Sequence, residues 1–159
     1  MKELMINIPV VAKQENELTE QEKALVEEAK AATYRSYSPY SKFSVGAAAL
    51  LSDGTIVSGS NQENSAYPSG LCAERTTIFY ANSKYPEKSV LKLCVAARDT
   101  EGKFTTRPIA PCGACRQVLV ETEARYNQPM KIMLYGTEHT YFIHSARELL
   151  PVSFDSSFF

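Results

Sequence analysis

The chain has 159 residues, of which 44% are hydrophobic and 22% are charged, and its formal net charge is −1. This length suits one domain that buries its own core, and the near-neutral charge gives no footprint for a polyanion, so nucleic acid is not an expected partner. The apolar residues near Met1 are too few and too interrupted for a secretion signal, and no run is long enough to cross a membrane. We therefore expect a cytoplasmic protein whose four cysteines are thiols or metal ligands.

Residues 1–17 are expected to form a surface strand or arm, and a helix follows them. Thr19 and Glu22 have the spacing of a capping box. Apolar residues then recur at helical spacing and predict one buried stripe, formed by Leu18, Leu25, Val26, Ala29 and Ala32. This helix is expected to end near residues 34–37.

Five strands are expected in the rest of the chain, at 45–51, 55–60, 90–97, 131–135 and 140–143. Asp53-Gly54 predicts a tight turn between the first two. The unbroken apolar run at 90–97 indicates a strand buried on both faces, with Cys94 as a small core residue. Two longer helices are expected at 72–84 and 112–125, and Ser145 should cap a short final turn. The order predicts an α/β fold with a five-stranded mixed sheet and helices on both faces.

The helix expected at 72–84 should turn Ile78, Phe79 and Ala81 toward the core. Two polar or aromatic segments near it allow more than one interpretation. In the loop 38–44, Tyr40 and Phe43 could fill the core or form a wall for a flat ligand, and the residues alone favour the core. The cluster at 61–65 could be a solvated loop or a site that binds hydroxyl groups.

Two cysteine motifs carry the chemistry. The first is Cys72-Ala73-Glu74-Arg75, and the second is Pro111-Cys112-Gly113-Ala114-Cys115-Arg116. Three thiolates can hold zinc and leave its fourth position open for water, as in a catalytic site. Helix N-termini favour thiolates, and the three-residue spacing of Cys112 and Cys115 places both sulfurs on one helix face. Glu74 is then the candidate proton shuttle.

Each part of this pattern also has a simpler interpretation. A lone Cys-x-x-Cys is often a structural zinc knuckle or a redox pair, and Glu74 could merely complement a helix dipole. Arg75 is by default a surface side chain, whereas in the catalytic interpretation Arg75 or Arg116 could donate hydrogen bonds to the ligand sulfurs. His139 and His144 are expected at the surface or outside the ligand set. The joint occurrence of the two motifs favours the catalytic interpretation.

The joint pattern resembles the zinc nucleobase deaminases, whose signature is His-x-Glu followed by Pro-Cys-x-x-Cys. With Cys72 in place of the histidine, the chain is most similar to the small tetrameric cytidine deaminases. Further landmarks of that family appear in order over roughly residues 20–155: Pro39-Tyr40-Ser41-Lys42-Phe43, Asn61-Gln62-Glu63-Asn64, Tyr67-Pro68 and Glu148-Leu149-Leu150-Pro151. Ser65 departs from the small apolar residue that is usual there.

The resemblance implies a role for each matching residue. It implies zinc ligands at Cys72, Cys112 and Cys115, and a proton shuttle at Glu74. It implies substrate binding by Phe43, Asn61, Glu63, Ala73 and Phe154, and a hydrogen bond from Arg75 to the sulfurs. Phe154 would reach the active site of a neighbouring subunit. The family fold is a three-layer α/β/α sandwich, here a single domain with an arm at 1–17, a core at 18–155 and a tail at 156–159.

The implied reaction is hydrolytic deamination of cytidine and deoxycytidine, with zinc as cofactor, a free nucleoside as substrate and a homo-oligomer, a tetramer, as the assembly. Rival hypotheses are deamination of another base or of a cytosine-like antibiotic, a nucleic-acid editor, and a non-catalytic zinc-stabilised interaction module. Glu63, placed for a free sugar hydroxyl, argues against a polymer substrate. The sequence leaves open ribose against deoxyribose and tetramer against dimer.

Overall fold

The structure is a computed structural model, and it describes residues 1–158. Phe159, the last residue of the expected tail, lies outside the described residues. The longer helices are α1 (Glu20–Ala32), α2 (Ala73–Lys84) and α3 (Gly113–Tyr126). The strands are β1 (Val11–Lys13), β2 (Ser44–Leu51), β3 (Ile56–Ser60), β4 (Val90–Arg98), β5 (Lys131–Leu134) and β6 (Thr140–Ile143). Among these residues, no helix is both long and apolar enough to span a bilayer.

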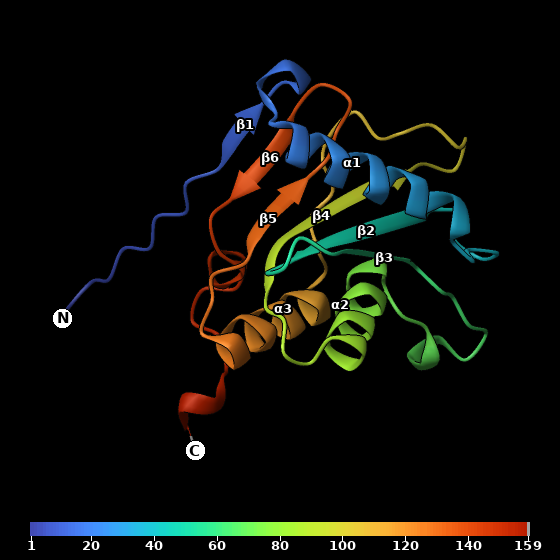
Figure 1. The fold of residues 1–159 in the computed structure, drawn as a ribbon. Helices are drawn as coiled ribbons and strands as arrows, with labels where there is room; N and C mark the ends of the chain where they lie inside the picture. Colours follow the sequence, from blue (N-terminus) through green and yellow to red (C-terminus); the bar gives the residue numbers. More distant parts are fainter. Residues whose placement is uncertain (159) are drawn as a thin grey trace.

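The strands form one mixed sheet in the order β1-β6-β5-β4-β2-β3 (Figure 1). The pair β4–β5 is parallel, and the other neighbours are antiparallel. The sheet therefore has six strands, and the expectation of five was wrong. The additional strand, β1, comes from the arm: Val11 pairs with Phe142 and Lys13 with Thr140 of β6.

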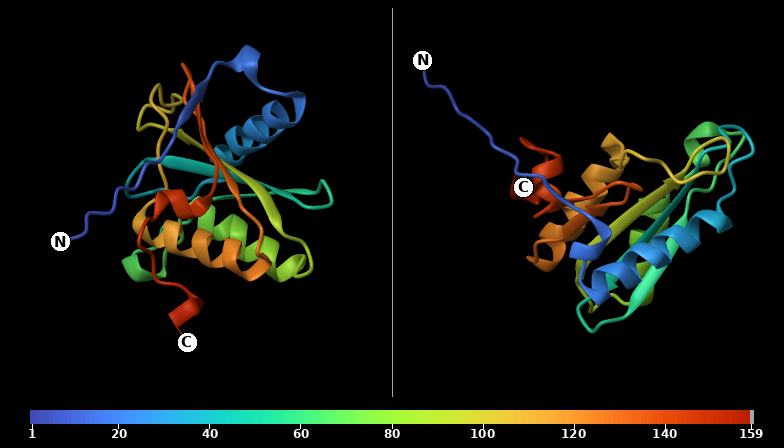
Figure 2. Two further views of the ribbon diagram at one scale, coloured as in Figure 1. Left: turned by 90° about the vertical axis from the view of Figure 1, so that its left-hand side faces the viewer. Right: turned by 90° about the horizontal axis from the view of Figure 1, so that it is seen from above.

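Helices cover both faces of the sheet, as predicted. Figure 2 shows α1 on one side of the strands and α2 and α3 on the other. Successive side chains of a strand point to opposite faces, and β2 divides accordingly. Ala47, Ala49 and Leu51 belong to one buried apolar cluster, which includes residues of α2 and α3, while Ala48 and Leu50 belong to a second one, which includes residues of α1. The expected apolar stripe of α1 is buried throughout, as is the thiol of Cys94.

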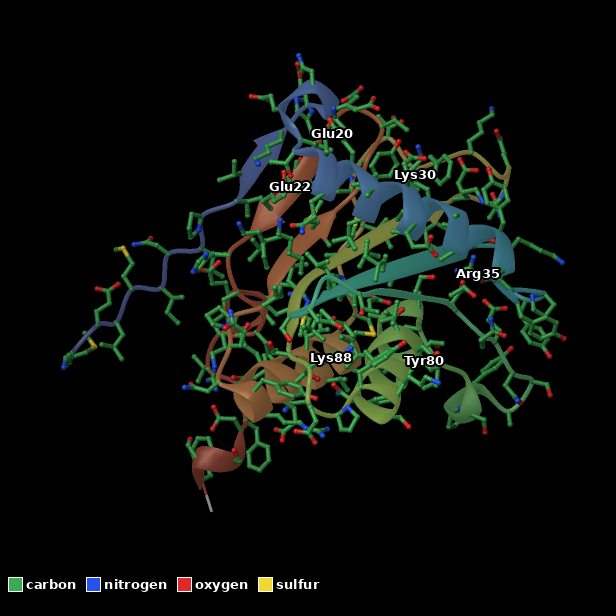
Figure 3. All side chains as sticks on the ribbon, in the orientation of Figure 1. Glu20, Glu22, Lys30, Arg35, Tyr80 and Lys88 are labelled. Carbon is green, nitrogen blue, oxygen red and sulfur yellow. The ribbon has the colours of Figure 1, made fainter. Side chains whose placement is uncertain are left out.

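The start of α1 is fixed by the predicted capping box. The Thr19 Oγ1 accepts a hydrogen bond from Glu22 N at 3.2 Å, and Thr19 N donates to Glu22 Oε2 at 3.1 Å. The Glu22 side chain is buried and also lies 3.4 Å from the Nζ of Lys13 and 3.6 Å from the Nζ of Lys92. Figure 3 shows Glu22 at the end of α1 that lies beside β1 and β6. This carboxylate therefore ties α1 to strands β1 and β4.

The inner face of α2 differs from the expectation at one residue. Ile78 and Ala81 are buried, but Phe79 is 46% exposed. One residue along a helix is a rotation of about 100°, so Phe79 turns away from the sheet when Ile78 faces it. Tyr80, labelled in Figure 3, is exposed as well. After β6, the Ser145 side chain accepts a hydrogen bond from Arg147 N and caps the short helix η4 (Ala146–Leu149), as predicted.

Candidate metal centre

Two helix N-termini carry the cysteine motifs, as the sequence predicts. Cys72 directly precedes α2 and Cys112 directly precedes α3, each with an extended backbone (ψ 156° and 167°). Their carbonyl oxygens accept the first helical hydrogen bonds, from Thr76 N and Arg116 N, both at 3.0 Å. Each sulfur thus lies at the partially positive end of a helix, which stabilises thiolates.

The three sulfurs meet at one point. Cys72 Sγ lies 3.8 Å from Cys112 Sγ, which lies 3.5 Å from Cys115 Sγ. Zinc with Zn–S bonds of about 2.3 Å in a tetrahedral set separates its sulfurs by about 3.8 Å, so the spacing fits this ion. Among residues 1–158, the cluster of metal-ligating side chains at this place contains these three cysteines and neither His139 nor His144. Zinc would therefore keep one position for a water molecule.

The pKa values of the cysteine thiols also favour the binding of a cation at this site. Hydrogen bonds from the Cys115 thiol and from Arg75 lower the pKa of Cys72 to about 5, although burial opposes them. The neighbouring Cys72 and burial raise the pKa of Cys115 well above its ordinary value. Three adjacent thiolates repel one another, so they are stable together when a metal ion offsets their charge.

Glu74 lies in the first turn of α2, next to these sulfurs. Its side chain is buried, with 4% exposed. Burial raises the pKa of Glu74 to about 6, and the charge of Cys72 acts in the same direction. A carboxyl group whose pKa approaches neutrality can both accept and donate a proton at cellular pH, as a proton shuttle requires.

The two arginines of the motifs have different partners. Arg75 Nη2 lies 3.9 Å from Cys72 Sγ, whereas the Nε of Arg75 is buried without a hydrogen-bond partner among residues 1–158. Arg116 instead donates to the carbonyl oxygens of Pro111 and Leu149, both at 2.8 Å. Of the two arginines considered for the sulfurs, Arg75 is the one with a hydrogen bond to them. Arg116 fixes the loop before α3 and the C-terminal segment.

A pocket of about 550 Å³ opens beside Cys72 and Arg75. Its lining includes two of the predicted substrate residues, Asn61 and Glu63. The other lining residues are Tyr40, Ser41, Gln62, Asn64, Tyr67, Gly70 and Leu71. For Tyr40 the residues alone favoured a place in the core, but its side chain is exposed and lines this pocket. No role followed from the sequence for Ser41 or Tyr67. These side chains belong to loops that are far apart in the sequence, and the residues within each loop do not predict that the loops lie side by side.

The Glu63 carboxylate is held by the loop that carries Tyr40. It accepts hydrogen bonds from Tyr40 N at 2.9 Å, from Ser41 N at 3.2 Å and from the Ser41 hydroxyl. The hydrogen bond from the Ser41 hydroxyl keeps the pKa of Glu63 below its ordinary value, although desolvation acts in the opposite direction. Glu63 is therefore ionised at neutral pH, and one of its roughly four acceptor positions is left for a ligand.

The other three predicted substrate residues do not line this pocket. Phe43 is half-buried, and its backbone N–H donates to the Ser41 Oγ at 3.1 Å. Ala73 is fully buried at the start of α2. Phe154 is 62% exposed and stacks on Phe158, with ring centroids 5.7 Å apart. The structure thus gathers the cysteines, Glu74, Arg75, Asn61 and Glu63 around one region, and leaves Phe154 at the surface.

Comparison with known proteins decides the family. A family model for the zinc-binding region of cytidine and deoxycytidylate deaminases matches residues 19–127. The chain belongs to this deaminase family. The matched region of the chain begins at the capping box of α1 and ends just after α3, so it includes both cysteine motifs and excludes the arm.

The chain matches curated cytidine deaminases over about two thirds of their length. The cytidine deaminase of Sporosarcina psychrophila is 54% identical over 97 residues, which is 61% of this chain and 66% of that protein. The cytidine deaminase of Halalkalibacterium halodurans is 45% identical over 97 residues, which is 61% of this chain and 68% of that protein. The crystal structure of the Burkholderia pseudomallei cytidine deaminase has a TM-score of 0.71 and 38% identity, and the match covers 86% of this chain and all of that one.

Proposed function

We propose that this deaminase hydrolyses cytidine and deoxycytidine to uridine and deoxyuridine with release of ammonia, and that zinc is its cofactor. The observation that carries the proposal is the three-sulfur cluster beside the buried carboxyl group of Glu74, next to a pocket of nucleoside size. Zinc, when bound to Cys72, Cys112 and Cys115, supplies an activated water for attack at C4 of the pyrimidine.

The residues of the chain move the protons of this reaction. Glu74 accepts a proton from the attacking water and delivers it to N3 of the base. The Glu74 carboxylate then takes a second proton, from the hydroxyl group now bonded to C4, and donates it to the exocyclic amine, which departs as ammonia when its bond to C4 breaks. Arg75 donates a hydrogen bond to the Cys72 sulfur and reduces the negative charge that three thiolates concentrate beside the substrate.

At the other end of the pocket, the hydrogen-bonding capacity of Asn61 and Glu63 suits one sugar hydroxyl. The Asn61 Oδ1 already accepts from Ser36 Oγ and Val45 N, and its Nδ2 donates to Phe43 O, so the amide has one N–H left. Glu63, as a carboxylate, can only accept. A ligand hydroxyl accepts from the first and donates to the second, which supports recognition of a free nucleoside.

An ultraviolet assay tests this function. Cytidine incubated with the purified protein should lose absorbance as uridine forms, and a zinc chelator should stop the loss. Deoxycytidine, guanine and blasticidin S, tested in parallel, separate cytidine deamination from action on another base or an antibiotic. Zinc-loaded protein that turns over none of these substrates would contradict the proposed function.

The assembly and location belong to the same proposal. We infer a homo-oligomer, a tetramer, in which Phe154 of one subunit completes the site of another. Gln117 Nε2 donates to the carbonyl oxygen of Phe154 at 2.9 Å and Arg147 Nη1 lies 2.9 Å from Asp155 Oδ2, which supports a fixed but outward position for the ring. A mass measurement in solution distinguishes tetramer, dimer and monomer. Four unpaired thiols support a cytoplasmic location.

A further inference from the structure

We propose that Ser36 is a positioning residue for the nucleoside site, and that it acts through the Asn61 amide. The proposal rests on the proposed function, in which Asn61 donates a hydrogen bond to a sugar hydroxyl. Ser36 lies between α1 and β2, outside the lining of the pocket. Its side chain therefore affects the substrate only through a residue that does line it.

The contacts of the Asn61 amide fix which of its two ends is available to a ligand. The Oδ1 accepts from Ser36 Oγ at 2.5 Å and from Val45 N at 2.8 Å, while Nδ2 donates to the carbonyl oxygen of Phe43 at 2.9 Å. An amide oxygen has two lone pairs, so both are used. A flipped amide would turn its N–H groups against the N–H of Val45 and its oxygen against the carbonyl of Phe43. The group left for the ligand is one N–H of Nδ2.

The backbone holds the Ser36 hydroxyl in place before any ligand binds. The neighbouring Tyr37 N donates to Asn61 O at 3.0 Å, and Glu63 N donates to Tyr37 O at 2.8 Å, so the segment around Ser36 runs along the segment that carries both substrate residues. The Ser36 Oγ also lies 3.2 Å from Ser38 Oγ. Ser38 Oγ lies in turn 3.3 Å from Ser44 Oγ at the start of β2. The hydroxyl groups of Ser36, Ser38 and Ser44 thus form a chain of hydrogen bonds across the base of the loop 38–44.

Within residues 1–158, Ser36 is the one side chain that binds the oxygen of this amide. When Ser36 is replaced, the remaining donor to the Asn61 Oδ1 is Val45 N, which belongs to the backbone of β2. One of the two lone pairs of the Oδ1 then has no partner. Val45 N and the Phe43 carbonyl still set the orientation of the amide, but one of its three contacts is lost, so it is held less firmly. Its freed lone pair then competes for water or for the hydrogen of the ligand hydroxyl. A net hydrogen bond of ordinary strength corresponds to a loss of about three- to ten-fold in kcat/KM. Since the contact lies far from the reacting atoms, the loss should appear in KM.

The test compares Ser36→Ala with the native protein on cytidine and on 2′,3′-dideoxycytidine, which lacks the 2′- and 3′-hydroxyl groups of the sugar. Ser36→Ala should lower kcat/KM for cytidine about three- to ten-fold through KM and leave the value for the dideoxy substrate unchanged. Ser36→Thr, which keeps the hydroxyl, should restore most of the loss. Ser58→Ala is the matched control, because Ser58 lies on β3 and its hydroxyl donates to Glu28 Oε1 at 2.5 Å, away from Asn61.

The outcomes separate the two levels of the proposal. A native protein that does not distinguish cytidine from its dideoxy form would overturn the sugar-binding role of Asn61, and the role of Ser36 with it. A native protein that discriminates, with a Ser36→Ala variant that discriminates equally well, would overturn the role of Ser36 alone, as would an equal loss on both substrates. Ser36 has φ −62° and ψ 136°, which alanine adopts freely, so the variant should fold. If it does not, Ser36→Cys, a weak donor, serves in the same comparison.

Discussion

Glu123 offers the sharpest test of how this fold holds its C-terminal part. The side chain lies in α3 and is 6% exposed. Its Oε2 accepts hydrogen bonds from Met130 N at 3.0 Å and from Ala146 N at 2.8 Å, and its Oε1 accepts from Ser145 Oγ at 2.6 Å. One carboxylate therefore joins α3, the residue before β5 and the start of η4.

Replacing Glu123 with alanine leaves these donors without their acceptor. The N–H groups of Met130 and Ala146 are buried, and a buried donor without a partner costs about 1–3 kcal/mol. Glu123→Ala should therefore lower the free energy of unfolding by about 3–5 kcal/mol. Glu123→Gln keeps one oxygen for both N–H groups and an amide that can donate to Ser145, so it should cost only about 1 kcal/mol.

Urea unfolding of the zinc-saturated variants measures the change in the free energy of unfolding for each substitution from the shift of the unfolding midpoint. This holds when the slope of the free energy against urea concentration is the same for all variants. Glu121→Ala, at an exposed position of the same helix, is the control and should change the free energy of unfolding by less than about 0.5 kcal/mol. Equal losses for the alanine and glutamine variants would show that the charge of Glu123, and not its acceptor geometry, stabilises this region. A loss below about 1 kcal/mol for alanine would refute the reasoning altogether.

Three further predictions concern the metal centre and the start of α1. Glu74→Gln should keep the zinc content but reduce turnover at least about 100-fold, because the amide cannot relay protons; near-native activity would exclude Glu74 as the shuttle. Cys112→Ala should lose zinc by metal analysis and lower the melting temperature, and a variant with one zinc per chain would contradict the ligand assignment. Burial alone would raise the pKa of Glu22, but Thr19 N and the charges of Lys13 and Lys92 hold it below 4.5. The ionised Glu22 carboxylate therefore stabilises the fold fully above pH 4.5, and this stabilisation is lost as the pH falls and the carboxylate is protonated. Glu22→Gln should lower the free energy of unfolding by about 1–2 kcal/mol at pH 7 and by progressively less below pH 4.5. A difference between the variant and the native protein that does not change with pH would refute this linkage.

The parts of the structure that sequence predicts well depend on local signals. The Thr19 and Glu22 pair sets the start of α1 within its own first turn, and Cys72 and Cys112 mark the starts of α2 and α3. The cysteine spacing likewise predicts that three sulfurs can meet, because each motif is compact along the chain.

The parts that sequence did not predict depend on contacts between distant segments. Strand β1 has three residues, and its pairing with β6 joins positions about 130 residues apart, which no local pattern signals. Arg116 follows Cys115 directly and Arg75 lies three residues after Cys72, and only the packing of the C-terminal segment turns Arg116 toward Leu149. The role of Ser36 is hidden for the same reason, since a serine before a loop carries no sign of the amide that it contacts.

The different exposure of the thiols has a practical consequence. Cys112 is the exposed thiol among the four cysteines, and Cys94 is sealed in the core. Thiols of a Cys-x-x-Cys pair at a helix start oxidise readily, so molecular oxygen and the metal compete for Cys112 and Cys115. A disulfide between Cys112 and Cys115 would remove two of the three thiolate ligands from the metal site. Protein purified without a reductant should therefore contain molecules that no later addition of zinc can activate, until a reducing agent restores the sulfurs.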